Sequence, residues 1–497
     1  MIMQQYVLGV DIGTGSTKAV AMDFEAKVLG AVNHHYPTFH PEPGYSEQDP
    51  ELIWTAFQQC IADTVDSLGA PPVMLSLSSA MHSIIPVDGK GKALGPMMTW
   101  ADVRSESIAT ELRGNPELAE QLYKSTGTPI HPMSPLCKLI WLQHDNPQKF
   151  KEVAKFISIK DFIWFRLFGH FETDHSIASA SGLFDIVALE WNDKACRLAG
   201  LEPDQLPLPQ PTHFIRKLEG EHLLEQLKLP SGTPVMIGAS DGCCANIGTR
   251  VNGGRKAALT IGTSGAVRIT GTHPVYNPKA MIFNYLLDEH TYVSGGAVNN
   301  GGNTVNWMIN KLLNINEIKD TDYEQLFKSI ASVAAGSEGL LFLPYLHGER
   351  APIWDAQASG AYLNIRNEHG QAHFLRAGLE GICFALKDVL NSIEEASDQV
   401  EVLHISGGFT SSEVWVQVLA DIIGLPLHLM QVEDASAIGA IYLALRECYP
   451  EAYQKLSAQP ADKIITPNAE NHELYSKKYL NYKQLYAALK PYMHQMN

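Results

Sequence analysis

The sequence predicts an α/β protein of two similar lobes, each with a mixed sheet and flanking helices, and with a cleft between the lobes. The first observation is length, because 497 residues exceed what one hydrophobic core usually supports. The second is a repeated opening of strand, glycine-rich hairpin and strand, at residues 6–22 and again at 256–268. The third is the alternation of strand and helix patterns after each opening. We therefore expect one lobe over residues 1–250 and a second over residues 251–497.

Apolar periodicity and turn residues place the elements of the first lobe. The three short strands of its opening form an antiparallel meander, and the proline-rich stretch before its last strand reads as a loop. In chain order, the patterns predict strands 6–10, 18–22 and 28–32, a helix 50–68, a strand 73–77, helices 105–124, 135–145 and 148–168, a loop 200–232 and a strand 234–238.

The second lobe repeats the pattern after its hairpin. In chain order, it predicts helices 303–314, 323–334 and 371–395, a strand 401–405, and helices 411–423 and 435–445. Ala435, Gly439 and Leu443 share one face of the last helix. Two small residues on that face permit another backbone to approach closely.

Composition and charge exclude several classes of protein. Lys and Arg total 37 against 54 Asp and Glu, a net charge of −17, and a chain this acidic without a basic cluster binds nucleic acid or an anionic membrane surface poorly. The 7 cysteines form no C-x-x-C pair, which is typical of a reduced compartment. No apolar run approaches the roughly 20 residues of a membrane span. We expect a cytoplasmic protein without a nucleic-acid or membrane partner.

Three glycine-rich links have the chemistry of phosphate binding. In Asp11–Thr17, two glycines and three hydroxyl residues form a turn whose backbone N–H groups can bind an anion, and Asp11 could hold a hydrated Mg²⁺. An ordinary hairpin turn is the alternative. Ile261–Gly265 offers similar chemistry in the second lobe, and Ser406–Phe409 gives a flat glycine surface before a helix N-terminus. Together they predict a clamp for a phosphorylated ligand.

Longer segments carry a specific resemblance. Met133–Trp141 resembles the first signature of the FGGY family of carbohydrate kinases, and Gly360–Ile365 with His373–Glu380 resembles the second, although Asn364 stands where the family usually has glycine. The resemblance covers essentially the whole chain. It implies two actin-like (ribonuclease H-like) lobes, with ATP and Mg²⁺ as the expected cofactors.

The resemblance also assigns roles to individual residues. It implies that Asp241 accepts a proton from the substrate hydroxyl; the alternative is a turn or N-cap residue before Gly242. The substrate-binding candidates are Met81, His82, Trp100, Asp102, Arg104, Met133 and Asp241. A structural histidine, and an Asp102–Arg104 pair that only fixes its loop, are the alternatives here.

The nucleotide side is implied in the same way. The candidates are Thr14, Ser16, Lys18, Gly262, Thr263, Gly302, Asn306, Gly408 and Ser412, with Asp11 as the metal ligand. Lys18 could instead be a solvated turn lysine.

The implied reaction is ATP-dependent phosphorylation of a terminal hydroxyl. Ser79–Ser83 and Thr99–Arg104 are similar to gluconate kinases, so D-gluconate, giving 6-phospho-D-gluconate, is the first expectation. D-Xylulose is the alternative substrate, and a non-catalytic sugar-sensing protein is the alternative class. Arg104 is the expected partner of the acid's carboxylate, followed by His82, Lys138 and Arg350. The oligomeric state stays open, with a homodimer as one alternative.

Overall fold

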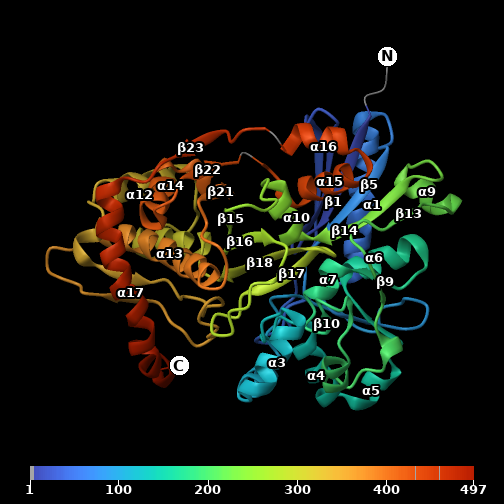
Figure 1. Cartoon of the computed structure of the whole chain (residues 1–497), viewed down its shortest axis with the longest axis horizontal. Helices are drawn as coiled ribbons and strands as arrows, with labels where there is room; N and C mark the ends of the chain where they lie inside the picture. The colour runs from blue at the N-terminus through green and yellow to red at the C-terminus, as the bar shows by residue number, and fades with distance from the viewer. Residues whose placement is uncertain (1–4, 431, 458, 497) are drawn as a thin grey trace.

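Two sheets with flanking helices form the molecule (Figure 1). The computed structural model describes residues 5–430, 432–457 and 459–496. No helix in this part of the chain has both the length and the apolar character that crossing a membrane requires.

The first sheet has six strands in the order β13-β14-β5-β1-β2-β3. β1, β2 and β3 form the predicted antiparallel meander, and β1 pairs in parallel with β5, which pairs in parallel with β14. The bounds are β1 Tyr6–Ile12, β2 Ser16–Asp23, β3 Val28–His35, β5 Met74–Ser79, β13 Ile215–Lys217 and β14 Pro234–Ser240.

The second sheet repeats this plan with seven strands in the order β17-β18-β16-β15-β21-β22-β23. β15 and β16 form the hairpin, and β15 pairs in parallel with β21 as β1 does with β5. The bounds are β15 Lys256–Ile261, β16 Gly265–Gly271, β17 Phe283–Asp288, β18 Thr291–Val298, β21 Val402–Ser406, β22 Leu427–Leu429 and β23 Lys463–Ile465. The predicted duplicated α/β architecture is confirmed.

Helices cover both sheets. The α-helices before the second sheet are α1 Pro50–Leu68, α2 Glu106–Arg113, α3 Pro116–Thr126, α4 Pro135–Asp145, α5 Pro147–Glu152, α6 Ile159–Phe168, α7 His175–Ser179, α8 Asp193–Leu198, α9 Glu221–Leu227 and α10 Asp241–Gly248. Those after its first strand are α11 Gly302–Trp307, α12 Asp320–Ala331, α13 Gln371–Glu394, α14 Glu413–Ile423, α15 Ala435–Cys448, α16 Pro450–Ser457 and α17 Ala469–Met496.

Short strand pairs fasten the connecting segments. They are β4 Glu47–Gln48 with β7 Met97–Met98, β6 Ile85–Val87 with β8 Lys155–Ile157, β9 Glu172–Asp174 with β12 Leu208–Gln210, β10 Phe184–Asp185 with β11 Glu190–Trp191, and β19 Leu341–Leu343 with β20 Ala361–Leu363.

Three predicted elements differ from the structure. The helix predicted at 105–124 is two helices, because the Asn115 side chain caps a new helix that starts at Pro116. The helix predicted at 148–168 is interrupted by β8, which pairs with β6. The stretch predicted as a loop at 200–232 contains two short strands and α9.

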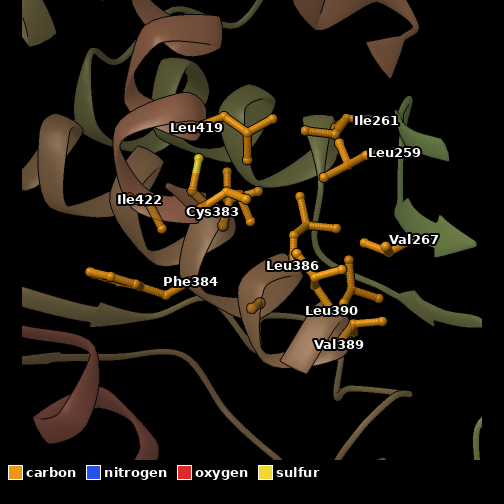
Figure 2. Packing of buried hydrophobic residues seen from close by; sticks show 14 of the residues in the cluster. Leu259, Ile261, Val267, Cys383, Phe384, Leu386, Val389, Leu390, Leu419 and Ile422 are labelled. Atoms are coloured by element: carbon orange, nitrogen blue, oxygen red, sulfur yellow. The ribbon is translucent and has the colours of Figure 1, made fainter. Parts of the chain in front are cut away.

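Helix α13 lies at the centre of the second lobe. Figure 2 shows Leu386, Val389 and Leu390 beside Val267 of β16, with Cys383 directed toward Leu419 of α14. These side chains belong to one buried cluster, so the helix holds the second hairpin against the rest of its lobe.

Helix α15 crosses from the second half of the chain to the first sheet. Ala437, Ile441 and other α15 residues share a buried cluster with Val7 of β1 and Met74 of β5. A Cβ on Gly439 would lie 1.8 Å from the carbonyl oxygen of Cys244 in α10. The close approach predicted for this helix is therefore real, and its partner is α10.

Candidate active site

Two carboxylates meet at the edge of the first sheet. Asp11 is near the carboxyl end of β1, and Asp241 is the first residue of α10, directly after the parallel strand β14. β5 lies between these strands, and the Oγ of its Ser78 donates to Asp11 Oδ1 at 2.7 Å. Ligands of α/β sheets commonly bind at such an edge.

Burial sets the protonation of both carboxylates. Burial, and then the charge of Asp11, raise the pKa of Asp241 to about 7. The pKa of Asp11 is also raised by burial, while Ser78 and Lys18 act in the opposite direction. A carboxylate with a pKa near neutrality suits a general base.

A cavity of 310 Å³ opens beside Asp241. Both hairpins reach it, Thr14 from the first and Gly262 and Thr263 from the second. Its other walls are formed by Met81, His82, Trp100, Met133, Thr260, Ser264, Gly265, Ala266, Arg268, Phe283, Tyr285, Ala297, Arg350 and Trp354. Its size lies at the small end of the range of about 300–1,000 Å³ usual for ligand sites.

His82 enters this cavity as a neutral ring. Burial, and then the charge of Lys138, lower its pKa to about 3. Nδ1 lies 2.8 Å from the carbonyl oxygen of Ala180, so Nδ1 carries the proton. Nε2 then accepts from the Tyr285 hydroxyl at 3.3 Å. The ring is fixed at both ends, which makes it a positioned wall of the cavity and not a cation.

Lys138 holds the backbone of the segments that form this wall. It is fully buried, and its Nζ donates to the carbonyl oxygens of His82 at 2.7 Å and Thr99 at 2.6 Å. Burial lowers its pKa to about 7. Lys138 therefore positions the two segments that carry His82 and Trp100.

Asp102 and Arg104 do not reach the cavity wall in the described structure. Arg104 Nη2 lies 2.6 Å from Asp102 Oδ2 and 2.6 Å from Glu47 Oε1, and its guanidinium is 3.5 Å from the Tyr45 ring centre. Asp102 also accepts from the Ser46 backbone at 2.8 Å. The polar atoms of Asp102 and Arg104 bond to each other, to Glu47 and to the Ser46 backbone, which is the geometry of the alternative in which the pair fixes its loop.

A second cavity of 750 Å³ also borders the second hairpin. It collects six of the predicted nucleotide residues: Gly262, Thr263, Gly302, Asn306, Gly408 and Ser412. The Gly302 N–H donates to the carbonyl oxygen of Gly262 at 2.8 Å, which fixes the hairpin to the start of α11. Both cavities share Gly262 and Thr263, so they meet at this hairpin.

Ser16 and Lys18 are not brought to either cavity in the described structure. Lys18 forms an ion pair with Asp434, which directly precedes α15. The carbonyl oxygen of Ser16 accepts from the Gly13 N–H at 3.0 Å and closes the first hairpin. Thr14, at the tip, accepts from Trp100 Nε1 at 2.9 Å and joins the hairpin to the cavity wall.

Several cavity residues were missed by sequence reasoning. Arg268, Phe283 and Tyr285 come from β16 and β17 of the second sheet, and Trp354 follows Arg350 in a loop. The signal available for Arg268 was a charged residue inside an otherwise apolar strand pattern directly after the second hairpin.

The donor set at the sheet edge suits a hard cation. The described residues contain no group of three or more His, Cys, Asp or Glu side chains arranged to hold a metal ion. Asp11 and Asp241 offer carboxylate oxygens only, and Mg²⁺ is usually held by one or two carboxylates together with phosphates and water. Asp11 is therefore the residue that could hold it.

The fold and the site define the class of two-lobed sugar kinases with the actin-like fold. The models of the FGGY family of carbohydrate kinases match residues 6–248 for the N-terminal domain and residues 257–448 for the C-terminal domain. The chain belongs to this family, as its signatures predicted.

Individual relatives show which sugar kinases the chain is similar to. The gluconokinase of Bacillus subtilis (strain 168) is 38% identical over an alignment of 458 residues, and this alignment covers 89% of this chain and 88% of the relative. The crystal structure of a gluconate kinase from Lactobacillus acidophilus superposes with a TM-score of 0.94 at 32% identity, covering 99% of this chain and 100% of that one. A ligand-bound xylulose kinase from Lactobacillus acidophilus gives a TM-score of 0.93 at 32% identity, with the same coverage.

Proposed function

We propose that the protein transfers the γ-phosphoryl group of ATP to the terminal hydroxyl of D-gluconate, giving 6-phospho-D-gluconate. The observation that carries the proposal is the meeting of two cavities at Gly262 and Thr263, with Asp241 on the smaller side. A sugar acid in the smaller cavity and a nucleotide in the larger one would face each other across this hairpin. The 38% identical gluconokinase supports gluconate as the acceptor.

Each residue has a role that follows from its position. Asp241 accepts the proton of the terminal hydroxyl, and the fixed His82 ring and Trp100 hold the carbon chain. The N–H groups of the second hairpin bind the phosphates. Gly408 and Ser412 line the part of the larger cavity that would hold the adenosine of ATP. Asp11 would hold Mg²⁺, which neutralises phosphate charge in reactions of this kind.

The test is an ADP-release assay over D-gluconate, D-xylulose, D-ribulose and glycerol, with the product identified by mass spectrometry. We expect the highest kcat/KM for D-gluconate. A higher kcat/KM for D-xylulose would reject gluconate as the substrate. It would favour xylulose phosphorylation, the activity in the name of the xylulose kinase from Lactobacillus acidophilus. The absence of ADP release with every acceptor would favour a sugar-sensing protein, although Asp11, Asp241, Gly262 and Gly408 are all present.

A further inference from the structure

Two arginines line the smaller cavity, and neither forms an ion pair among the described residues. Arg268 is on β16, and Arg350 lies in the loop between β19 and β20. Among the residues that the structure describes, each guanidinium has one hydrogen bond to a neutral oxygen and neither forms an ion pair. An arginine that is mostly withdrawn from water normally has an anionic partner.

Arg350 has an unused donor. Its Nη2 donates to the carbonyl oxygen of Val298 at 3.2 Å, and its Nε is buried without a partner in the described structure. The guanidinium lies 5.3 Å from the ring centre of Trp100, a residue of the first half of the chain that lines the same cavity. Leaving a buried charged donor unsatisfied is costly, so the guanidinium, which belongs to a residue that lines the cavity, would gain from a further acceptor there.

Arg268 lies next to the proposed base. Its Nη1 donates to Thr260 Oγ1 at 3.2 Å, and its Nε is 3.6 Å from the position that a Cβ on Gly242 would take. Asp241 is close enough to act on the charge of Arg268, yet the two form no ion pair among the described contacts. The charge of Arg268 is therefore only partly offset by Asp241, and Glu349 acts in the same way on Arg350.

The guanidinium groups of Arg268 and Arg350 both act on the hydroxyl of Tyr285, which lines the same cavity. Both lower the pKa of the Tyr285 hydroxyl, although burial raises it overall, and the charge of Arg268 also lowers the pKa of Arg350. Among the residues that line this cavity, Arg268 and Arg350 face one carboxylate, Asp241. The lining therefore carries an excess of positive charge, which favours an anionic ligand over a neutral sugar.

The other basic side chains near this cavity are neutral or already have hydrogen-bond or ion-pair partners in the protein. Arg104 is paired with Asp102 and Glu47, and Lys138 donates to two carbonyl oxygens. His82 is neutral, because its pKa is lowered to about 3.

We propose that Arg268 and Arg350 together bind the carboxylate of the sugar acid and thereby select an acid over a neutral sugar. The proposal rests on gluconate as the substrate. One guanidinium can meet a carboxylate with two parallel hydrogen bonds, and two guanidiniums can divide its two oxygens. The transferred phosphoryl group is the other oxyanion that could reach this place, and the test separates the two.

The experiment measures the binding of D-gluconate by calorimetry without nucleotide. D-Glucitol, which has a CH₂OH group in place of the carboxylate, is the neutral comparison. Arg268→Met and Arg350→Met should each raise the Kd for gluconate by about 10- to 150-fold, the range of one charge-assisted hydrogen bond. Neither should weaken the binding of glucitol. The lysine variants at both positions should recover part of the affinity, because they keep the charge and lose the paired geometry.

Controls separate binding from folding. Arg166→Met removes an exposed arginine that pairs with Glu51 and should leave the Kd unchanged. The double variant should weaken binding by less than the product of the two single effects, because both arginines contact one group. Melting temperatures identify any variant that does not fold, and the lysine variants then carry the comparison.

The outcomes are distinct. An unchanged gluconate Kd in both methionine variants overturns the proposal, and if turnover then falls equally with every acceptor, the arginines bind the phosphoryl group. An effect confined to one arginine overturns the shared site. If the unmodified protein binds xylulose and not gluconate, the proposed substrate fails and the carboxylate site fails with it.

Discussion

At the scale of single residues, burial gives Asp241 its chemistry. The pKa of this carboxyl is raised to about 7 by burial and by the charge of Asp11, to which Ser78 donates a hydrogen bond. Such a group is a weak acid near neutrality and accepts a proton readily when it is ionised. Its charge state is therefore a pH-sensitive quantity of the site, beside that of Lys138, whose pKa is lowered to about 7.

The pH dependence of turnover should report this group. A protonated Asp241 cannot accept the hydroxyl proton, so kcat/KM should fall as the pH drops below about 7 and reach a plateau above it. Initial rates at saturating ATP, measured across this range, give the apparent pKa. A profile that is flat through neutrality would contradict the assignment of Asp241 as the base.

Asp241→Asn should separate binding from chemistry. The amide keeps the shape and cannot take up a proton, so kcat should fall by about 10²–10⁴-fold while the Kd for the sugar acid changes little. Calorimetry and single-turnover kinetics measure the two quantities. Asp66→Asn, at an exposed ion pair with Lys228, is the matched control and should match the unmodified protein. Near-normal kcat in Asp241→Asn would remove this residue from the mechanism.

At the scale of elements, the packing of α15 on α10 depends on missing side chains. A Cβ on Gly439 would lie 1.8 Å from Cys244 O, and one on Gly248 would lie 2.2 Å from Ala435 O. The two backbones therefore touch at glycine from both sides. This contact joins α10, which follows β14 and begins with Asp241, to α15, which covers β1.

Gly439→Ala should destabilise the protein. In an exposed helix this change stabilises by about 1 kcal/mol, but here the new methyl group meets backbone, and overpacking costs about 1–3 kcal/mol. Urea denaturation measures the free energy of unfolding. Gly30→Ala, whose nearest atom would be 3.9 Å away, is the control and should be close to neutral. A stabilised Gly439→Ala protein would show that the two helices separate easily.

Local sequence signals explain which elements could be predicted. Asp49 caps α1, Pro50 begins it, and Gly69 ends it in the left-handed conformation, so this helix follows from its own residues. Asn115 and Pro116 give the same signal for a helix start. The apolar pattern on both sides of them nevertheless favoured one continuous helix over 105–124. β8 could not be predicted, because it exists through its pairing with β6.

The site shows the same division between local and distant causes. The hairpins depend on glycine spacing, so the sequence indicated them. Arg104 was the obvious carboxylate partner by resemblance, yet Glu47 and Asp102 neutralise it. Whether an arginine has a free charge depends on what the fold brings to it, and for Arg268 and Arg350 this could be read only from the structure.

At the scale of the whole molecule, both lobes contribute residues to the candidate site. Asp241 and His82 belong to the first half of the chain, whereas the second hairpin and both cavity arginines belong to the second. The cavity that contains Asp241 touches both hairpins, so its walls come from both halves of the chain. Domain closure around a ligand is a common transition in proteins with such a site.

Binding should therefore compact the molecule. D-Gluconate together with a non-hydrolysable ATP analogue should give a smaller radius of gyration in small-angle scattering than the unliganded protein, because the lobes close to exclude water. Gly262→Val is the matched control: a Cβ there meets nothing within 4 Å, so the variant should fold, but its side chain fills the junction of the cavities. Identical curves with and without both ligands would indicate a cleft that is already closed.

The crossing of α15 has a consequence for how the protein is made. Strands of the first sheet end at Ser240, yet the helix that covers β1 and β5 spans residues 435–448. A chain emerging from the ribosome presents an uncovered apolar face until almost all of it has been translated, so the N-terminal half cannot become native ahead of the C-terminal half. A truncated product that ends between the two sheets would carry Asp241, the proposed proton acceptor, and would still be an unfinished, aggregation-prone fragment. The two halves are therefore a single unit of folding despite their duplicated design.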